Sequence, residues 1–218
     1  MDQYRIAKQM SIGTGIQIAI LNVLENISNI NKSVLPRLQI DELTKYRNQF
    51  DIDKRLLARS YLYEFIKSNY GITKFDLQLN RFEKPSLMYA PNIKFSFSYA
   101  KEYVLVGISE GRKLGLDIEY VNTQLDVEEI AREIMNTNEL LKFQSYDLQL
   151  RRNYFFKVFS AKESIVKAYG VGLFVDVKTL DSEQSYSMFN SEEFMYDSSE
   201  IWRGEYVIST CFQVLKDR

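Results

Sequence analysis

A helical segment that ends at a Tyr-Gly pair and leads into strands occurs twice in this chain, and no other feature restricts the fold as strongly. The first copy ends at Tyr70 and Gly71, and the second ends at Tyr169 and Gly170, about half a chain further on. Glycine ends helices because it adopts the left-handed conformation without a steric penalty. This similarity is either a chance match of a few residues or the result of a duplication. A duplication predicts two similar α+β halves, residues 1–110 and 111–218, with a ligand cleft between them.

The hydrophobic pattern predicts further helices and strands around this pair. We expect helices over residues 41–50, 53–69, 126–135, 137–143 and 148–169. We expect strands over residues 16–23, 74–79, 93–99, 103–109, 114–121, 174–180 and 205–214. Since only short turns separate the strands of residues 93–121, that stretch is predicted to be an antiparallel meander.

The absence of histidine excludes several kinds of chemistry. The 218 residues contain no histidine and a single cysteine, Cys211. Ser/His and Cys/His catalytic pairs, imidazole metal ligands and an internal disulfide are therefore all excluded. A bound metal would have to be a hard cation with oxygen ligands, and proton transfer would fall to Asp, Glu, Lys or Tyr. The formal net charge of −1 gives no field that would hold a polyanion, so nucleic acid is not an expected partner.

The sequence gives no sign of a membrane segment or a secretion signal. The apolar stretch of residues 16–24 is too short to span a bilayer, and Gln17 and Asn22 interrupt it. No clean apolar run is followed by a small-residue cleavage site. We therefore expect a cytoplasmic protein that does not contact a membrane, and the lone cysteine agrees with a reducing compartment.

Residues 115–119, Gly-Leu-Asp-Ile-Glu, place two carboxylates on one predicted strand. Asp117 and Glu119 share a face of that strand because side chains two residues apart point the same way. One interpretation is the solvent face of an amphipathic strand. The other is a pair of carboxylates held together by a shared cation such as Mg²⁺.

The longest predicted helix carries a glutamate and a lysine that need partners. Glu163 and Lys167 are four residues apart, and as an exposed ion pair they would contribute only about 0.3–0.5 kcal/mol. The helix is apolar around most of its circumference, so both side chains are expected to face inward, where an unpaired charge is costly. If Glu163 meets Asp117 and Glu119, three carboxylates can share one divalent cation, and Lys167 can contact phosphate oxygens.

Taken together, these two blocks resemble a known family. Residues 115–119 and the segment Phe-Ser-Ala-Lys-Glu-Ser-Ile-Val-Lys at 159–167 are similar, in order and spacing, to the blocks G-[IV]-D-[IVL]-E and W-[ST]-x-K-E-[AS]-x-x-K. Those blocks are typical of the 4′-phosphopantetheinyl transferases, specifically the larger, monomeric, surfactin-synthetase-activating (Sfp) type. The continuation Gly-Val-Gly-Leu at 170–173 is similar to the G-x-G-L segment of the family.

Weaker matches extend the resemblance over roughly residues 40–180 and imply contacts to coenzyme A. Residues 83–86 resemble the G-K-P-x element, which places Lys84 near the nucleotide. Residues 95–100 are similar to F-N-x-S-H-S, with Ser98 retained and Tyr99 in place of the phosphate-binding His. Tyr99 can donate a hydrogen bond but carries no positive charge. Residues 53–59 resemble the R-x-L-L-x-R helix start that supplies cations to the phosphates, with Lys54 in the Arg position, and Lys45 matches a further basic position.

A last match concerns the proton acceptor. Residues 130–139 are similar to I-A-x-R-x-F-x-x-x-E, which places Glu139 where the family has a carboxylate proposed as the general base. The alternative is that Glu139 merely stabilises the first turn of a short helix through the helix dipole. In the scheme that the resemblance implies, Glu139 and Lys167 are catalytic, and Asp117, Glu119 and Glu163 bind Mg²⁺.

The resemblance implies both a fold and an activity. The fold would be α+β, with two similar α/β halves related by a pseudo-twofold axis and the active site at their interface. The activity would be Mg²⁺-dependent transfer of 4′-phosphopantetheine from coenzyme A to a serine of an acyl or peptidyl carrier protein of fatty acid, polyketide or nonribosomal peptide biosynthesis, by a monomer. Two alternatives remain: a non-catalytic relative that binds coenzyme A or a carrier protein, and a plain interaction module.

Overall fold

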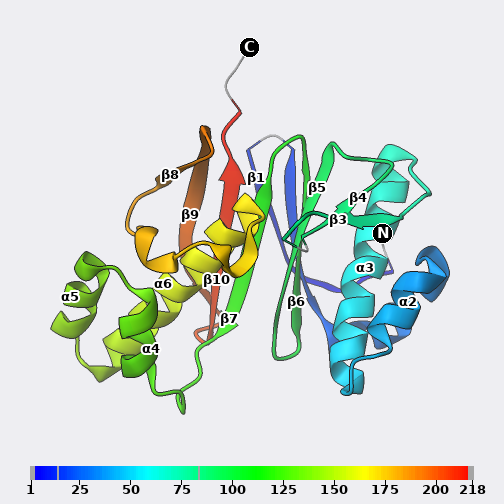
Figure 1. Cartoon of the computed structure of the whole chain (residues 1–218). Coiled ribbons are helices and arrows are strands. Elements are labelled where there is room, and N and C mark those ends of the chain that lie inside the picture. Colours follow the sequence, from blue (N-terminus) through cyan, green and yellow to red (C-terminus); the bar gives the residue numbers. More distant parts are fainter. Residues whose placement is uncertain (1–2, 14, 83, 216–218) are drawn as a thin grey trace. The chain divides into compact units, whose positions relative to one another are not determined.

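The chain divides into two compact units. The computed structural model describes residues 3–13, 15–82 and 84–215, and the units are Met1–Gly111 and Arg112–Arg218 (Figure 1). Each unit combines an antiparallel sheet with one long helix that packs against it.

The first unit is built on a four-stranded sheet with the order β1-β2-β6-β5. The strands are β1 (Ile6–Ile12), β2 (Ile16–Asn22), β5 (Ile93–Ala100) and β6 (Tyr103–Glu110). Helix α3 (Gln49–Tyr70) packs against the sheet, and its Leu56, Leu57 and Leu62 are fully buried. The remaining elements are α1 (Val23–Asn26), α2 (Arg37–Leu43), two 3-10 turns η1 (Ile27–Asn29) and η2 (Lys32–Val34), and the hairpin β3 (Leu77–Leu79) and β4 (Pro85–Leu87).

The second unit is built on a sheet with the order β7-β10-β9-β8. The strands are β7 (Leu114–Tyr120), β8 (Tyr186–Phe189), β9 (Glu192–Trp202) and β10 (Tyr206–Gln213). Helix α6 (Leu148–Tyr169) packs against β7, β9 and β10, and α4 (Val127–Ile134) and α5 (Thr137–Ser145) pack against α6. Two 3-10 turns, η3 (Gly172–Phe174) and η4 (Val177–Thr179), follow α6.

The two units repeat one arrangement of strands and helix. In each, a strand (β2 or β7) precedes a helix of 22 residues, and a later strand (β6 or β10) returns to pair antiparallel with that first strand. Each long helix ends at a left-handed glycine, Gly71 with φ of 67° and Gly170 with φ of 73°. Edge strands complete each sheet: β1 beside β2, and β8 beside β9. The predicted fold class of two similar α+β halves is confirmed, whereas the pseudo-twofold axis and a site between the halves stay predictions.

Three local predictions are wrong. Residues 93–121 are not a single meander, because β5 and β6 pair with each other while β7 pairs with β10. Turn residues show where a strand ends, but its partner is chosen by packing over the whole unit. Residues 174–180 are not a strand, since most of them lie in η3 and η4, where the Asp176 side chain accepts from the Lys178 N–H. The helix expected over 41–50 is instead α2, which ends at Leu43.

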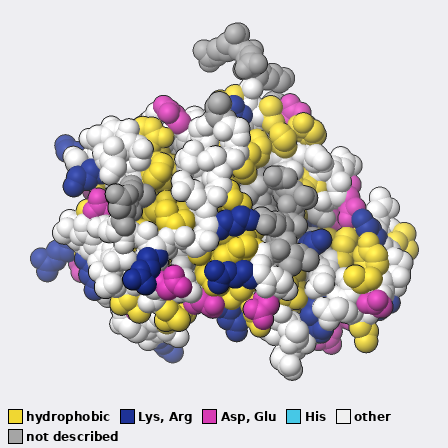
Figure 2. Space-filling model, turned by 180° about the vertical axis from the view of Figure 1, so that it is seen from behind, with side chains coloured by type: hydrophobic (Ala, Val, Ile, Leu, Met, Phe, Trp, Pro, Cys, Tyr) yellow, Lys and Arg dark blue, Asp and Glu magenta, His cyan; other side chains and the backbone are white. Residues whose placement is uncertain are grey.

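The surface carries both signs of charge. On the face shown in Figure 2, Lys and Arg side chains lie among Asp and Glu side chains and form no continuous basic field. Within the described residues, no helix combines the length and the apolar character that crossing a membrane requires.

Candidate active site

Strand β7 and helix α6 touch backbone to backbone at Gly115. A Cβ added to Gly115 would lie 1.9 Å from the carbonyl oxygen of Ser164 and 2.3 Å from the nitrogen of Ala168. Because real Cβ atoms do not approach other atoms this closely, only glycine fits at this position. This close approach brings the carboxylates of β7 beside the polar side chains of α6.

Asp117 and Lys167 join the strand to the helix. The Lys167 Nζ donates to Asp117 Oδ1 at 2.6 Å, and the Asp117 side chain is 2% exposed whereas that of Lys167 is 30% exposed. A charged hydrogen bond of this kind is short and strong because both partners are ionised. Lys167 thus balances one of the negative charges that β7 carries.

The remaining carboxylates of this cluster hold their protons unusually tightly. Burial, and then the negative charges of Asp117 and Glu163, raise the pKa of Glu119 to about 8, against the opposing effect of Lys167. Burial also raises the pKa of Glu163, with Lys167 acting in the opposite direction and Asp117 in the same direction. The structure therefore places Asp117, Glu119, Glu163 and Lys167, which we call the acidic cluster, within electrostatic reach of one another.

In its donor chemistry, the acidic cluster fits a divalent cation. Its three carboxylates are hard oxygen ligands, and their surplus negative charge would be relieved by Mg²⁺. Among the described residues, however, no three Asp, Glu or Cys side chains are gathered closely enough to hold a metal ion. Lys167 occupies Asp117 Oδ1 in this arrangement. A magnesium site formed by Asp117, Glu119 and Glu163 stays a prediction.

The raised pKa of Glu119 predicts that the metal-free protein loses stability as the pH rises from about 4.5 to about 8. The folded state binds this proton more tightly than the unfolded chain, whose value is near 4.5, so the stabilising contribution is lost as the pH rises through about 8. Asp117, Glu163 and Lys167 all face the same carboxyl group. Calorimetric Tm values across this range test the prediction, and Glu119→Gln should flatten the curve. An equally steep fall in that variant would contradict it.

The structure corrects the role predicted for Glu139. Its side chain is fully buried, and Oε2 accepts from the Lys162 Nζ at 2.6 Å and from the Asn136 N–H at 2.9 Å. Oε1 accepts from the N–H and the hydroxyl of Ser182, at 2.8 and 2.6 Å. Both oxygens are occupied and neither reaches the surface, so Glu139 is not placed to take a proton from another protein. The capping-box pattern of Asn136 followed three residues later by Glu139 was the sequence signal for this structural role.

In the first unit, Tyr99 lies beside Arg55 and Arg59 of α3, which belong to the segment 53–59 that resembles the R-x-L-L-x-R helix start. The Arg55 guanidinium lies over the rings of Tyr46 and Tyr99, with Cζ 4.3 and 4.9 Å from the ring centroids. Burial raises the pKa of the Tyr99 hydroxyl, although the positive charges of Arg59 and Arg55 act the other way. Among the described residues, neither arginine pairs with a carboxylate. Two cations without acidic partners, held by aromatic rings, are suited to bind an anion.

The other residues predicted to bind coenzyme A are dispersed in the first unit. Lys54 pairs with Asp51 at 2.8 Å and lies over the Phe50 ring. Ser98 is buried on β5, Lys45 is exposed just beyond α2, and Lys84 closes the turn after β3, where its N–H donates to Asn80. Their contacts to coenzyme A stay predictions.

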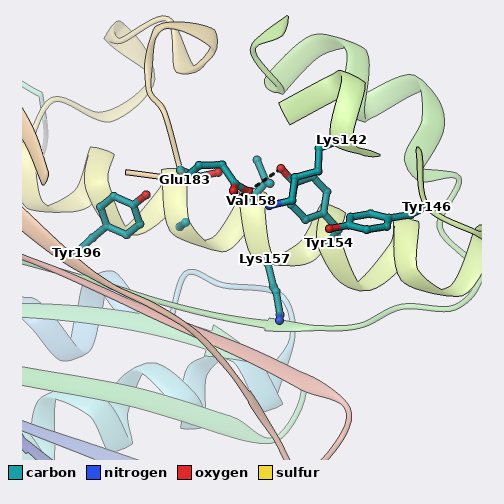
Figure 3. A pocket seen from close by; sticks show the side chains of 9 residues that line it. Lys142, Tyr146, Tyr154, Lys157, Val158, Glu183 and Tyr196 are labelled. Atoms are coloured by element: carbon teal, nitrogen blue, oxygen red, sulfur yellow. Dashed lines mark hydrogen bonds and ion pairs between the residues drawn. The ribbon is translucent and has the colours of Figure 1, made fainter. Parts of the chain in front are cut away.

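A cavity of about 390 Å³ lies on another side of α6. Figure 3 shows Glu183 near Tyr154, with Tyr196 across the cavity and the Lys157 ammonium directed away from them. Glu183 accepts from the Lys142 ammonium at 2.6 Å and from the Tyr154 hydroxyl at 2.8 Å. Because these polar groups satisfy one another, the cavity presents little unmet hydrogen-bonding capacity, and it contains no member of the acidic cluster.

Comparisons with known proteins agree on one family. Residues 113–211, which include Gly115 and the whole acidic cluster, match the 4′-phosphopantetheinyl transferase superfamily. The chain is 28% identical over 162 residues to the 4′-phosphopantetheinyl transferase gsp of Aneurinibacillus migulanus, an alignment that covers 72% of this chain and 65% of gsp. It is 25% identical over 135 residues to the 4′-phosphopantetheinyl transferase Sfp of Bacillus subtilis, covering 61% of this chain and 59% of Sfp.

The alignments span less than two thirds of these curated relatives. A third relative, the 4′-phosphopantetheinyl transferase HetI of a Nostoc species, is 25% identical over 136 residues, which cover 59% of this chain and 54% of HetI. The holo-[acyl-carrier-protein] synthase of Thermotoga maritima overlaps with 48% of this chain and 64% of its own, at 18% identity and a TM-score of 0.36, a likeness too low to support any conclusion. Over residues 113–211, and in the parts aligned with the three sequence relatives, this chain is similar to the 4′-phosphopantetheinyl transferase superfamily.

Proposed function

We propose that this protein transfers the 4′-phosphopantetheine group from coenzyme A to a serine of an acyl or peptidyl carrier protein, in a Mg²⁺-dependent reaction. The observation that carries the proposal is the convergence of the acidic cluster at the Gly115 contact, inside the segment that matches the superfamily. The relatives named above bear the name of this activity. The monomeric state and the cytoplasmic location are part of the proposal.

The reaction is a phosphoryl transfer, in which the serine oxygen attacks the β-phosphorus and 3′,5′-adenosine bisphosphate leaves. Such a reaction needs charge neutralisation and positioning more than covalent chemistry. Lys167 is 30% exposed, so its ammonium can reach a phosphate oxygen as well as Asp117. Arg55 and Arg59 have no acidic partner among the described residues, and we assign them to the anionic groups of coenzyme A.

Asp117, Glu119 and Glu163 would hold the magnesium ion, which supplies charge neutralisation at the pyrophosphate when it is bound. We do not assign the acceptance of the serine proton to Glu139. Glu139 is fully buried and already paired.

The direct test is a mass measurement. We would incubate the full chain with coenzyme A, Mg²⁺ and a panel of apo acyl and peptidyl carrier proteins, and look for the phosphopantetheine increment on the carrier. The increment should require both the metal and the target serine. Binding of coenzyme A without an increment on any carrier would identify a non-catalytic relative. Binding of neither coenzyme A nor carrier would leave the plain interaction module.

Removing Arg55 or Arg59 is expected to weaken coenzyme A binding. Arg55→Ala and Arg59→Ala should each raise KM for coenzyme A about 10-fold or more, because a hydrogen bond to a charged group contributes roughly 1.5–3 kcal/mol. We expect kcat to change less, since α3 carries no member of the acidic cluster. Steady-state kinetics at fixed ionic strength measure both values. Lys67→Ala, an exposed position on the same helix, is the control and should leave KM unchanged. Unchanged KM values in the arginine variants would remove these residues from the proposed binding site.

A further inference from the structure

The residues on either side of Glu163 in α6 are both held by the rest of the second unit. The Ser164 carbonyl lies against Gly115 of β7. Lys162 is 2% exposed and, at about 100° per residue, projects from the other side of Glu163. Glu163 therefore lies between two anchored neighbours, one fixed through its backbone and one through its side chain.

The Lys162 ammonium has all its donors satisfied. It donates to Glu139 Oε2 at 2.6 Å, to the Ile134 carbonyl at 2.7 Å and to the Val177 carbonyl at 3.0 Å. An ammonium has three N–H donors, so three acceptors from three different segments fix both its place and its direction. Lys162 thereby ties α6 to the end of α4, to α5 and to η4.

Glu139 completes this connection. Besides Lys162, its carboxylate accepts from the Asn136 N–H and from the N–H and hydroxyl of Ser182. The pair is therefore a fully hydrogen-bonded buried ion pair, the form in which two charges can be removed from water. Apolar side chains could fill the same space, but apolar contact is non-directional and would leave the rotation of α6 less defined.

We propose that Glu139 and Lys162 are a positioning pair that fixes the rotation of α6 and so directs Glu163 and Lys167 toward Asp117 and Glu119. The proposal rests on the proposed function, in which these four residues act on the pyrophosphate of coenzyme A. The Glu163 carboxylate lies farther from the helix axis than the backbone does, so a small rotation of α6 displaces it by more than it displaces the backbone. Glu139 and Lys162 themselves touch no substrate in this role.

The decisive variant is the double substitution Glu139→Gln with Lys162→Met. Either single substitution that removes a charge leaves the other charge buried without its partner and costs stability for that reason alone. The double variant removes both charges, so its Tm should lie closer to wild type than that of Lys162→Met. We expect it to bind Mn²⁺, measured by titration calorimetry, about 10- to 100-fold more weakly, the usual effect of losing a group that orients metal ligands. Its kcat should fall by a larger factor than its KM for coenzyme A rises, because Arg55 and Arg59, which we assign to coenzyme A, lie in the other unit.

A matched control exists in the same unit. Lys142 and Glu183 form an ion pair that is 43% and 40% exposed, and Lys142→Met with Glu183→Gln should leave Mn²⁺ affinity and kcat unchanged. A folded Glu139→Gln/Lys162→Met protein with wild-type Mn²⁺ affinity and kcat would overturn the proposal and leave the pair a purely structural one. If the double variant does not fold, Glu139→Gln alone, assayed below its Tm, must show the same losses for the proposal to stand. A wild-type protein that transfers nothing and binds no Mn²⁺ would overturn the proposed function, and the positioning role with it.

Discussion

Gly115→Ala is expected to reduce phosphopantetheine transfer by about 100-fold or more, since a shift of about 1 Å in a catalytic arrangement is enough for such a loss. The new methyl group would lie 1.9 Å from the Ser164 carbonyl, so β7 and α6 would have to move apart. That movement separates Asp117 and Glu119 from Glu163 and Lys167. Inserting a methyl group into a packed contact also costs about 1–3 kcal/mol of stability. Transfer kinetics and denaturant unfolding measure the two effects.

The control for this variant is Gly71→Ala. Gly71 has a φ of 67° but no atom within 4 Å of an added Cβ, so alanine there suffers only the backbone strain of the left-handed conformation, about 1–2 kcal/mol. Gly71→Ala should therefore lose stability and keep its transfer activity at temperatures where it is folded. If the two glycine variants lost activity to the same extent, the close contact of β7 and α6 would not be the source of the effect.

Glu163→Gln should likewise lose transfer by about 100-fold or more, because the magnesium ion that Glu163 would help to hold would supply several kcal/mol of transition-state stabilisation. The free energy of unfolding should stay the same or rise. Burial already raises the pKa of Glu163, and glutamine removes a negative charge from the acidic cluster. The matched control is Glu64→Gln in α3, which precedes Gly71 by as many residues as Glu163 precedes Gly170. Glu64 accepts a hydrogen bond from Asn31 at 2.6 Å and faces no carboxylate cluster, so its transfer rate should be unchanged. An active Glu163→Gln protein would remove this residue from the chemistry.

The sequence predicted what local pattern controls. The hydrophobic period of each segment and the residues at its ends predicted helix α6, its stop at a glycine, and the strands β5, β6 and β7. All of these signals lie within a few residues of the element that they predict. The shared face of Asp117 and Glu119 follows from the period of a strand. The structure adds that this face lies close to Glu163 because β7 and α6 meet at Gly115, where an added Cβ would lie 1.9 Å from the Ser164 carbonyl oxygen.

What the sequence could not predict depends on contacts between distant segments. Arg55 lies over Tyr46 and Tyr99 only because α3, the segment after α2 and β5 meet in the folded unit. Glu139 was taken for a base because its motif position does not reveal that it is buried against Lys162. The strands β1, β8 and β9 were missed because their side chains are partly exposed or irregular in pattern, and pairing with neighbours determines such strands more than propensity does.

The repeated architecture of the two units has a consequence for how this protein can be altered. The helix of one repeat carries arginines that have no acidic partner in the part of the chain that the structure describes. The helix of the other carries Glu163 and Lys167 of the acidic cluster, yet each helix packs on its own sheet with its own buried core. Under the proposed function, coenzyme A binding by α3 and the transfer rate set by α6 can therefore be altered separately. Substitutions on α3 would then change the donor that is accepted, for instance toward analogues lacking a phosphate, and leave the residues of α6 unchanged.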